Sequence, residues 1–165
     1  MRKILKIVEN HKASLGIRFL NNLLDMLVLI AINFVLTMSC NILFSVTGIR
    51  YFYFYSNNGI WWDFLIGNIN CFIYYFIMEN FFNGKTVGKY ITGTKVISTD
   101  GTKPTTQQIV YRNLTRLIPF DGLSFLGNNG WHDSWTDTRV INMKNYESEI
   151  QAKSEIDSLG KKEIA

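Results

Sequence analysis

Cysteine is scarce in this sequence, with Cys40 and Cys71 as the only two among 165 residues. Both lie in apolar stretches, and neither has a second cysteine or a histidine at the spacing that metal sites use. The sequence therefore favours neither a zinc site nor a disulfide framework. We expect no metal and no other cofactor.

Charge is absent altogether from the run Met26–Ile49. A helix of this run would be roughly 36 Å long at ~1.5 Å per residue, whereas the hydrocarbon core of a bilayer is about 30 Å thick. Buried helices of soluble proteins rarely run so long without a polar face, and the run is too long and begins too late for a signal peptide. A second run, Phe64–Met78, is also uncharged and ends beside Glu79. The sequence thus predicts two transmembrane helices, over about 19–48 and 60–82.

The formal net charge of +4 is spread unevenly along the chain. Lysines and arginines are frequent before the first run and after Phe82, but Arg50 is the only basic residue between the two runs. Because segments rich in lysine and arginine stay in the cytoplasm, both termini are predicted to be cytoplasmic. The pattern indicates a multi-pass membrane protein, and we expect no nucleic acid partner.

Two further cytoplasmic segments flank the predicted membrane domain. Residues 1–17 are basic and partly amphipathic, so we expect them to lie along anionic lipid headgroups, with a disordered basic tail as the alternative. Residues 142–165 carry charges of both signs and few large apolar side chains, which is typical of a solvated tail. The lipid bilayer, with its anionic headgroups, is therefore the first expected partner.

A glycine-rich stretch follows the second run and is expected to form a cytoplasmic loop, with the marked residues Gly84, Lys85, Gly88, Lys89 and Gly93. Gly84-Lys-Thr resembles part of a phosphate-binding loop, but that motif needs another glycine where Glu79 stands and a strand before it. Nucleotide binding is therefore not expected. The β-branched residues and the Asp100-Gly101 pair that follow favour a small β-hairpin over 90–104.

A third helix is predicted from Thr105 to about Ile118, with Pro104 in its first turn. Apolar residues share one face of this helix, while Arg112 and Arg116 lie one turn apart on the other. This pattern is typical of a basic amphipathic helix. Its arginines are expected to reach either lipid phosphates or carboxylates of the protein.

The apolar stretch that follows Pro119 is too short to cross a bilayer unaided, so the segment 105–126 is predicted to be interfacial or re-entrant. The expected fold class is therefore an all-α membrane protein. It has two transmembrane helices, a basic amphipathic interfacial or re-entrant third helix, and a small cytoplasmic β-hairpin.

The first predicted span is not uniformly apolar. Arg18, Asn22 and Asp25 share one face of its first turns at 100° per residue. An aspartate inside a span costs about 2.5–3.5 kcal/mol at the helix centre. This face is therefore expected to contact protein or water and not lipid.

His132 and Asp133 are adjacent and lie between Trp131 and Trp135. A histidine beside an aspartate is half of a catalytic pair, but no nucleophile motif accompanies it. Tryptophans favour the membrane–water interface, so we interpret His132 as an interfacial histidine. The sequence predicts no catalytic residue and no enzymatic activity.

Together these features resemble the RDD family of bacterial membrane proteins, which is named for one arginine and two aspartates. Arg18 matches the family arginine, Asp25 the first aspartate and Asp133 the second. The resemblance covers about residues 14–141, and we place the membrane domain at 18–141. It implies an integral protein of the bacterial inner membrane that is suspected of transport, with sodium–proton exchange attributed to some members. Supporting residues of the pattern are Asn22, Arg112, Arg116, Trp131 and His132.

Two functions from different classes follow. The first is a part in the transport of an unidentified ligand or ion, by a homo-oligomer because two spans enclose little volume. The alternative is a non-catalytic accessory or scaffold subunit of a larger membrane protein complex. In either case we hypothesise that Arg18, Asp25 and Asp133 form one charge-compensated cluster near the cytoplasmic boundary, since an unpaired carboxylate there is costly. Arg18 is then shared between the acids or joined by Arg112 or Arg116.

The charge distribution makes a prediction about topology. A reporter fused at Asn57 should be external, and reporters at Lys103 and after Ala165 should be cytoplasmic, because the segment between the two runs holds a single basic residue. Fusions to alkaline phosphatase and to a fluorescent protein measure the two locations. Labelling of Lys103 from outside intact cells would contradict the prediction.

Overall fold

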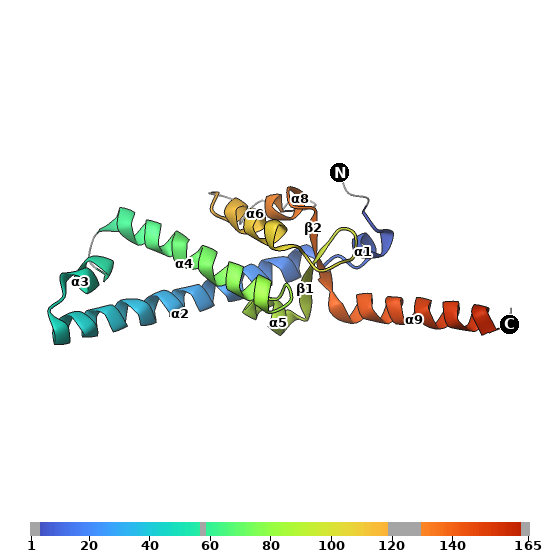
Figure 1. Ribbon diagram of the computed structural model, residues 1–165, viewed down its shortest axis with the longest axis horizontal. Helices are drawn as coiled ribbons and strands as arrows, with labels where there is room; N and C mark the ends of the chain where they lie inside the picture. The colour runs from blue at the N-terminus through green and yellow to red at the C-terminus, as the bar shows by residue number, and fades with distance from the viewer. Residues whose placement is uncertain (1–3, 57–58, 119–129, 163–165) are drawn as a thin grey trace.

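A computed structural model describes residues 4–56, 59–118 and 130–162, which are mostly helical with one two-stranded sheet (Figure 1). Two long helices, α2 (Leu15–Thr47) and α4 (Ile60–Phe81), come together near the middle of the view in Figure 1, where the shorter elements gather. A short helix, α3 (Arg50–Ser56), lies against α2 at the far end of the two helices. The remaining described elements, apart from the long C-terminal helix, therefore sit together at one end of the two long helices.

Both predicted spans are confirmed as helices long and apolar enough to cross a membrane. Ser14 caps the start of α2, where its Oγ accepts a hydrogen bond from the Ile17 amide at 3.4 Å. Gly48 ends the helix in the left-handed conformation, at a φ of 66°. Phe34 and Ile42 are each 62% exposed, which is unfavourable in water but suits a lipid environment.

A polar contact connects the two long helices. The Asn70 side-chain amide of α4 donates hydrogen bonds to Asn33 Oδ1 of α2 at 2.6 Å and to the Tyr55 hydroxyl of α3 at 3.2 Å. In lipid such groups must find partners within the protein. These bonds therefore hold α2, α3 and α4 together along their apolar lengths.

The sheet pairs β1 (Thr94–Ser98) with β2 (Thr138–Asn142) in antiparallel register, so that Val96 lies opposite Val140. The small two-stranded sheet is confirmed, but the local hairpin predicted over 90–104 is wrong. The turn at Asp100-Gly101 does form, since the Gly101 amide donates to the Ser98 carbonyl at 2.9 Å.

The chain after this turn cannot return as a strand. Pro104 has no amide hydrogen to donate to a ladder, and Thr105 is already the N-cap of the next helix. The partner strand therefore comes from a distant part of the sequence.

The N-terminal segment packs on this sheet. In α1 (Lys6–Asn10), Val8 is fully buried against Ile97 and Ile141. Backbone bonds from the Leu5 amide to the Thr99 carbonyl at 2.9 Å and from the Ala13 amide to the Val140 carbonyl at 2.8 Å flank α1. The alternative of a disordered basic tail is therefore wrong for residues 4–14, whereas contact of this segment with lipid headgroups stays a prediction.

The predicted third helix is α6 (Thr106–Arg116), which follows a capping box between Thr105 and Gln108. Pro104 lies just before the cap and not within the first turn as predicted. Arg112 is 0% exposed, whereas Tyr111 is 64% exposed. The basic face thus points into the protein, where it contacts carboxylates instead of lipid headgroups. The predicted segment 119–126 lies outside the described residues.

The predicted charged tail is largely helical, as α9 (Met143–Lys162). Figure 1 shows α9 extending away from the other elements. Near its start, Tyr146 packs against the core cluster of α1 and the sheet, and Glu149 forms an ion pair with His11. Beyond these contacts the described side chains of α9 are exposed.

Replacement of Ile141 by alanine should lower the free energy of unfolding by about 2–5 kcal/mol, because it empties the space between α1 and the sheet. Ile156→Ala on α9 is the matched control and should change it by no more than about 0.5 kcal/mol, since Ile156 is 67% exposed. Unfolding of the purified protein in mild detergent measures both. Equal effects would contradict this description of the core.

Candidate functional site

Asp25 of α2 is held by neutral donors. Its Oδ1 accepts hydrogen bonds from the Tyr74 hydroxyl and the Gly88 amide, both at 2.8 Å, and its Oδ2 accepts one from the Thr86 hydroxyl at 2.6 Å. Asp25 is only 2% exposed. Both carboxylate oxygens therefore accept hydrogen bonds, and neutral donors stabilise the carboxylate in place of an ion pair with a cationic side chain.

The predicted glycine-rich loop is what brings these donors to Asp25. Thr86 is the N-cap of α5 (Val87–Thr92), and a Cβ at Gly88 would lie 2.5 Å from the Asn21 carbonyl oxygen of α2. Gly84, at a φ of 78°, approaches β1 equally closely, since a Cβ added at Gly84 would lie 2.5 Å from the Val96 carbonyl oxygen. Only glycine fits at these two positions without backbone movement.

The other marked residues of this loop have separate roles. Gly93 ends α5 in the left-handed conformation, and its carbonyl accepts a hydrogen bond from the Met143 amide at 3.1 Å. The Lys85 ammonium lies 4.9 Å from the centre of the Tyr90 ring. Neither residue lines the site, so the predicted loop contributes only in part.

Glu79, at the end of α4, binds three cations and is fully buried. Its Oε1 lies 2.6 Å from the Lys89 ammonium and 3.2 Å from Arg116 Nη2, and its Oε2 lies 3.2 Å from Arg112 Nε. Lys89 and Arg112 are 3% and 0% exposed. Burial lowers the pKa of the Lys89 ammonium, and the adjacent Glu79 carboxylate opposes that shift. This carboxylate is the centre of a buried ion-pair network.

Sequence reasoning placed Glu79 at the end of the second span but did not include it among the site residues. A signal was present, because an acid at the end of an apolar run must be paired or neutralised in the folded protein. The cations that follow in the loop and the third helix were its natural partners.

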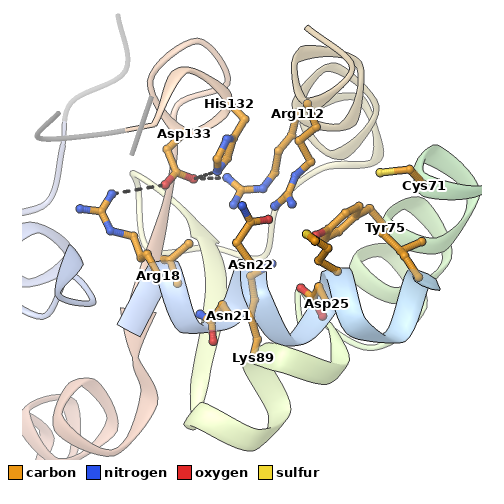
Figure 2. Close-up of a pocket in the computed structure, with 14 residues that line it drawn as sticks. Arg18, Asn21, Asn22, Asp25, Cys71, Tyr75, Lys89, Arg112, His132 and Asp133 are labelled. Carbon is orange, nitrogen blue, oxygen red and sulfur yellow. Dashed lines mark hydrogen bonds and ion pairs between the residues drawn. The ribbon is translucent and has the colours of Figure 1, made fainter. Parts of the chain in front are cut away.

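Asp133 belongs to the short helix α8 (Trp131–Ser134) and is 1% exposed. It forms an ion pair with Arg112 Nη1, which also donates to the Thr138 hydroxyl at 2.7 Å. Arg18 Nη1 lies 4.0 Å from Asp133 Oδ2, whereas His132 Nε2 lies 3.9 Å from Oδ1, the oxygen that pairs with Arg112 (Figure 2). Burial alone would raise the pKa of Asp133, but Arg112, His132 and Arg116 together outweigh burial and the pKa falls to about 2.

The predicted cluster of Arg18, Asp25 and Asp133 therefore forms in part. Arg18 and Asp133 are brought together and Arg112 joins them, as expected. Asp25 is not bonded to an arginine among the described residues and is held by the loop instead. All three residues nevertheless line the same cavity.

This cavity has a volume of about 240 Å³ and lies where α2 meets α4, α5, α6, α8 and β2 (Figure 2). One part of its wall is polar and includes Asn22, which rises from α2 toward the middle of the site. The apolar part consists of Met26, Leu29, Cys71, Tyr75 and Val140. Among the described residues no group of three or more His, Cys, Asp or Glu side chains is placed to hold a metal ion.

Arg116 shapes the same wall. Its guanidinium carbon lies 3.9 Å from the centre of the Tyr75 ring, so it stacks on α4 while pairing with Glu79. Of the supporting residues predicted, Asn22, Arg112, Arg116 and His132 line the cavity. Trp131 is the first residue of α8.

In the comparison with family models, the model of the RDD family matches residues 12–142. This range includes the two long helices, the loop, α6, α8 and both strands. No curated protein and no solved structure matches the chain.

Replacement of Glu79 by glutamine should destabilise the protein by about 3–5 kcal/mol, because Lys89, Arg112 and Arg116 would be left buried without their counter-charge. Glu147→Gln is the matched control, since Glu147 is exposed on α9, and its effect should stay within about 0.5 kcal/mol. Thermal unfolding in detergent and the amount of protein in the membrane measure the change. A Glu79→Gln protein as stable as the control would refute the network.

Proposed function

The chain belongs to the RDD family, and on this premise we propose that it is a small inner-membrane protein that takes part in the transport of a small ligand. Two apolar helices support the membrane location. The basic residues that precede α2 and follow α4 support an orientation with both termini in the cytoplasm. In this orientation the cavity lies at the cytoplasmic ends of the two spans.

The cavity is the observation that carries the proposal. Its polar wall contains the three residues for which the family is named, and its apolar wall is formed mainly by α2 and α4. Pockets with a few convergent polar groups on an apolar background are the usual sites for small ligands. We therefore assign the ligand to this cavity and no enzymatic reaction to its residues.

Asp25 is not the proposed ligand-binding group. Its oxygens already accept three hydrogen bonds, from Tyr74, Thr86 and Gly88, which leaves little of the carboxylate available to a ligand. Its role in the proposal is to fix α5 against α2. Two spans enclose little volume, so the proposal includes a homo-oligomer as the transporting unit.

An accessory or scaffold subunit is the second candidate, and α9 favours it. This helix extends away from the other elements (Figure 1) and exposes Ile150 and Ile156, at 44% and 67%. An exposed helix with apolar residues is a suitable contact for another subunit. Size and composition analysis after purification in mild detergent separates the two, since a stoichiometric partner favours the accessory role and a single-species oligomer favours transport.

The transport proposal predicts that Asn22→Leu reduces saturable uptake about tenfold or more, because it removes a polar group that faces the cavity and is worth about 1.5–3 kcal/mol toward a charged ligand. Proteoliposomes with purified protein are tested in turn with radiolabelled sodium, phosphate and glycerol phosphate. Asn68→Leu is the matched control, since Asn68 bonds only within α4, to the Phe64 carbonyl at 2.7 Å. Uptake no higher than in protein-free liposomes for every probe would refute transport by this chain alone.

A further inference from the structure

Positive side chains are frequent around the cavity in the part of the chain that the structure describes. We count the charged side chains that line it, together with Glu79, which pairs with three of them. Four of these described side chains are positive and three are negative, so the described wall of the cavity is rich in cations. The seven side chains are Arg18, Asp25, Glu79, Lys89, Arg112, Arg116 and Asp133.

Two polar groups at the cavity also lack partners. Arg112 uses Nε and Nη1 for Glu79, Asp133 and Thr138, but its Nη2 is buried and has no hydrogen-bond partner within residues 4–56, 59–118 and 130–162. The side-chain amide of Asn22 forms no hydrogen bond to the described part of the chain either. Arg112 is fully buried, whereas Asn22 is half-buried. A buried donor without an acceptor, such as Arg112 Nη2, is rare in folded proteins, and an unoccupied ligand position is one reason for it.

From the cation-rich wall and the buried Arg112 donor without a partner, we propose that the cavity binds an oxyanion of the phosphate type. This rests on the proposed role of the cavity as the ligand site, and it names the class of ligand. A phosphate group offers several acceptor oxygens, which suit the guanidinium of Arg112 and the amide of Asn22 at once. A monovalent cation in the same position would be repelled by the buried guanidinium of Arg112.

The apolar wall adds a second requirement. Met26 and Leu29 of α2 and Cys71 and Tyr75 of α4 line the cavity. Figure 2 shows Cys71 and Tyr75 on the side away from α8, and Met26 is 55% exposed to the surroundings of the helices. A phosphate that carries an apolar chain would use both parts of the wall. Phosphate chemistry is shared by the headgroup of an anionic phospholipid and by a soluble phosphate, so the experiment has an arm for each.

The test uses the purified full-length protein and follows its thermal unfolding midpoint. One arm adds inorganic phosphate in neutral detergent, with sodium chloride at equal ionic strength as the reference. The other compares nanodiscs of phosphatidylcholine with nanodiscs that also contain phosphatidylglycerol. A ligand at 100 times its Kd should raise the midpoint of the wild type by about 5–10 °C.

Variants place the binding in the cavity. Asn22→Leu should fold, because Asn22 has no partner to lose, and should abolish the increase, whereas Asn68→Leu should keep it. Cys71→Phe fills the apolar part without changing charge, so it should remove the effect of phosphatidylglycerol and leave that of inorganic phosphate. An increase with phosphate identifies the soluble anion as sufficient, and an increase with phosphatidylglycerol alone identifies the lipid.

Three results would overturn the inference. They are no increase in either arm, an increase with sodium chloride that phosphate does not exceed, and an increase that Asn22→Leu retains in full. Failure of the transport proposal remains distinguishable. If the protein binds an anion but shows no uptake that depends on Asn22, the transport proposal is refuted and the anion site stands. If it shows uptake that depends on Asn22 but binds no anion, the transport proposal stands and the class of ligand is wrong.

Discussion

The buried carboxylate of Glu79 is the group on which the rest of the site depends. It ends α4 at 0% exposure and meets Lys89 of α5 and two arginines of α6 within 3.2 Å. Without this carboxylate, three cations would be buried without a counter-charge at the end of an apolar helix, which is strongly unfavourable. The short elements can thus pack against the two long helices only because α4 places Glu79 among them.

Arg112 connects this carboxylate to the other side of the site. Its rigid, planar guanidinium pairs with Glu79 through one edge and with Asp133 and Thr138 through Nη1. One side chain of α6 therefore contacts α4, α8 and β2. The same constraint turns the polar face of α6 inward and leaves Tyr111 and Leu114 exposed at 64% and 46%, an arrangement suited to apolar surroundings.

Sequence reasoning predicted the helices that long local patterns of residues encode. It was less accurate for contacts between residues that lie far apart in the chain. The spans and α6 followed from apolar runs and helical periodicity. The cluster hypothesis for Asp25 correctly required compensation, but it considered only arginines, and the donors are hydroxyls and a backbone amide. The strand at 94–98 was expected, yet a short strand carries no signal for a partner that lies many residues away.

The two long apolar helices, the third helix and the RDD pattern could be predicted from the sequence, because hydrophobicity, periodicity and charge distribution are sums over residues close together in the chain. Only the tertiary structure decided which carboxylate pairs with which cation. The charged groups of the site come from α2, α4, α5, α6 and α8, and the same residues permit many pairings. The choice depends on separations of a few ångströms, because the interaction between two charges falls with distance and with the water between them, and those separations exist only once the helices have packed.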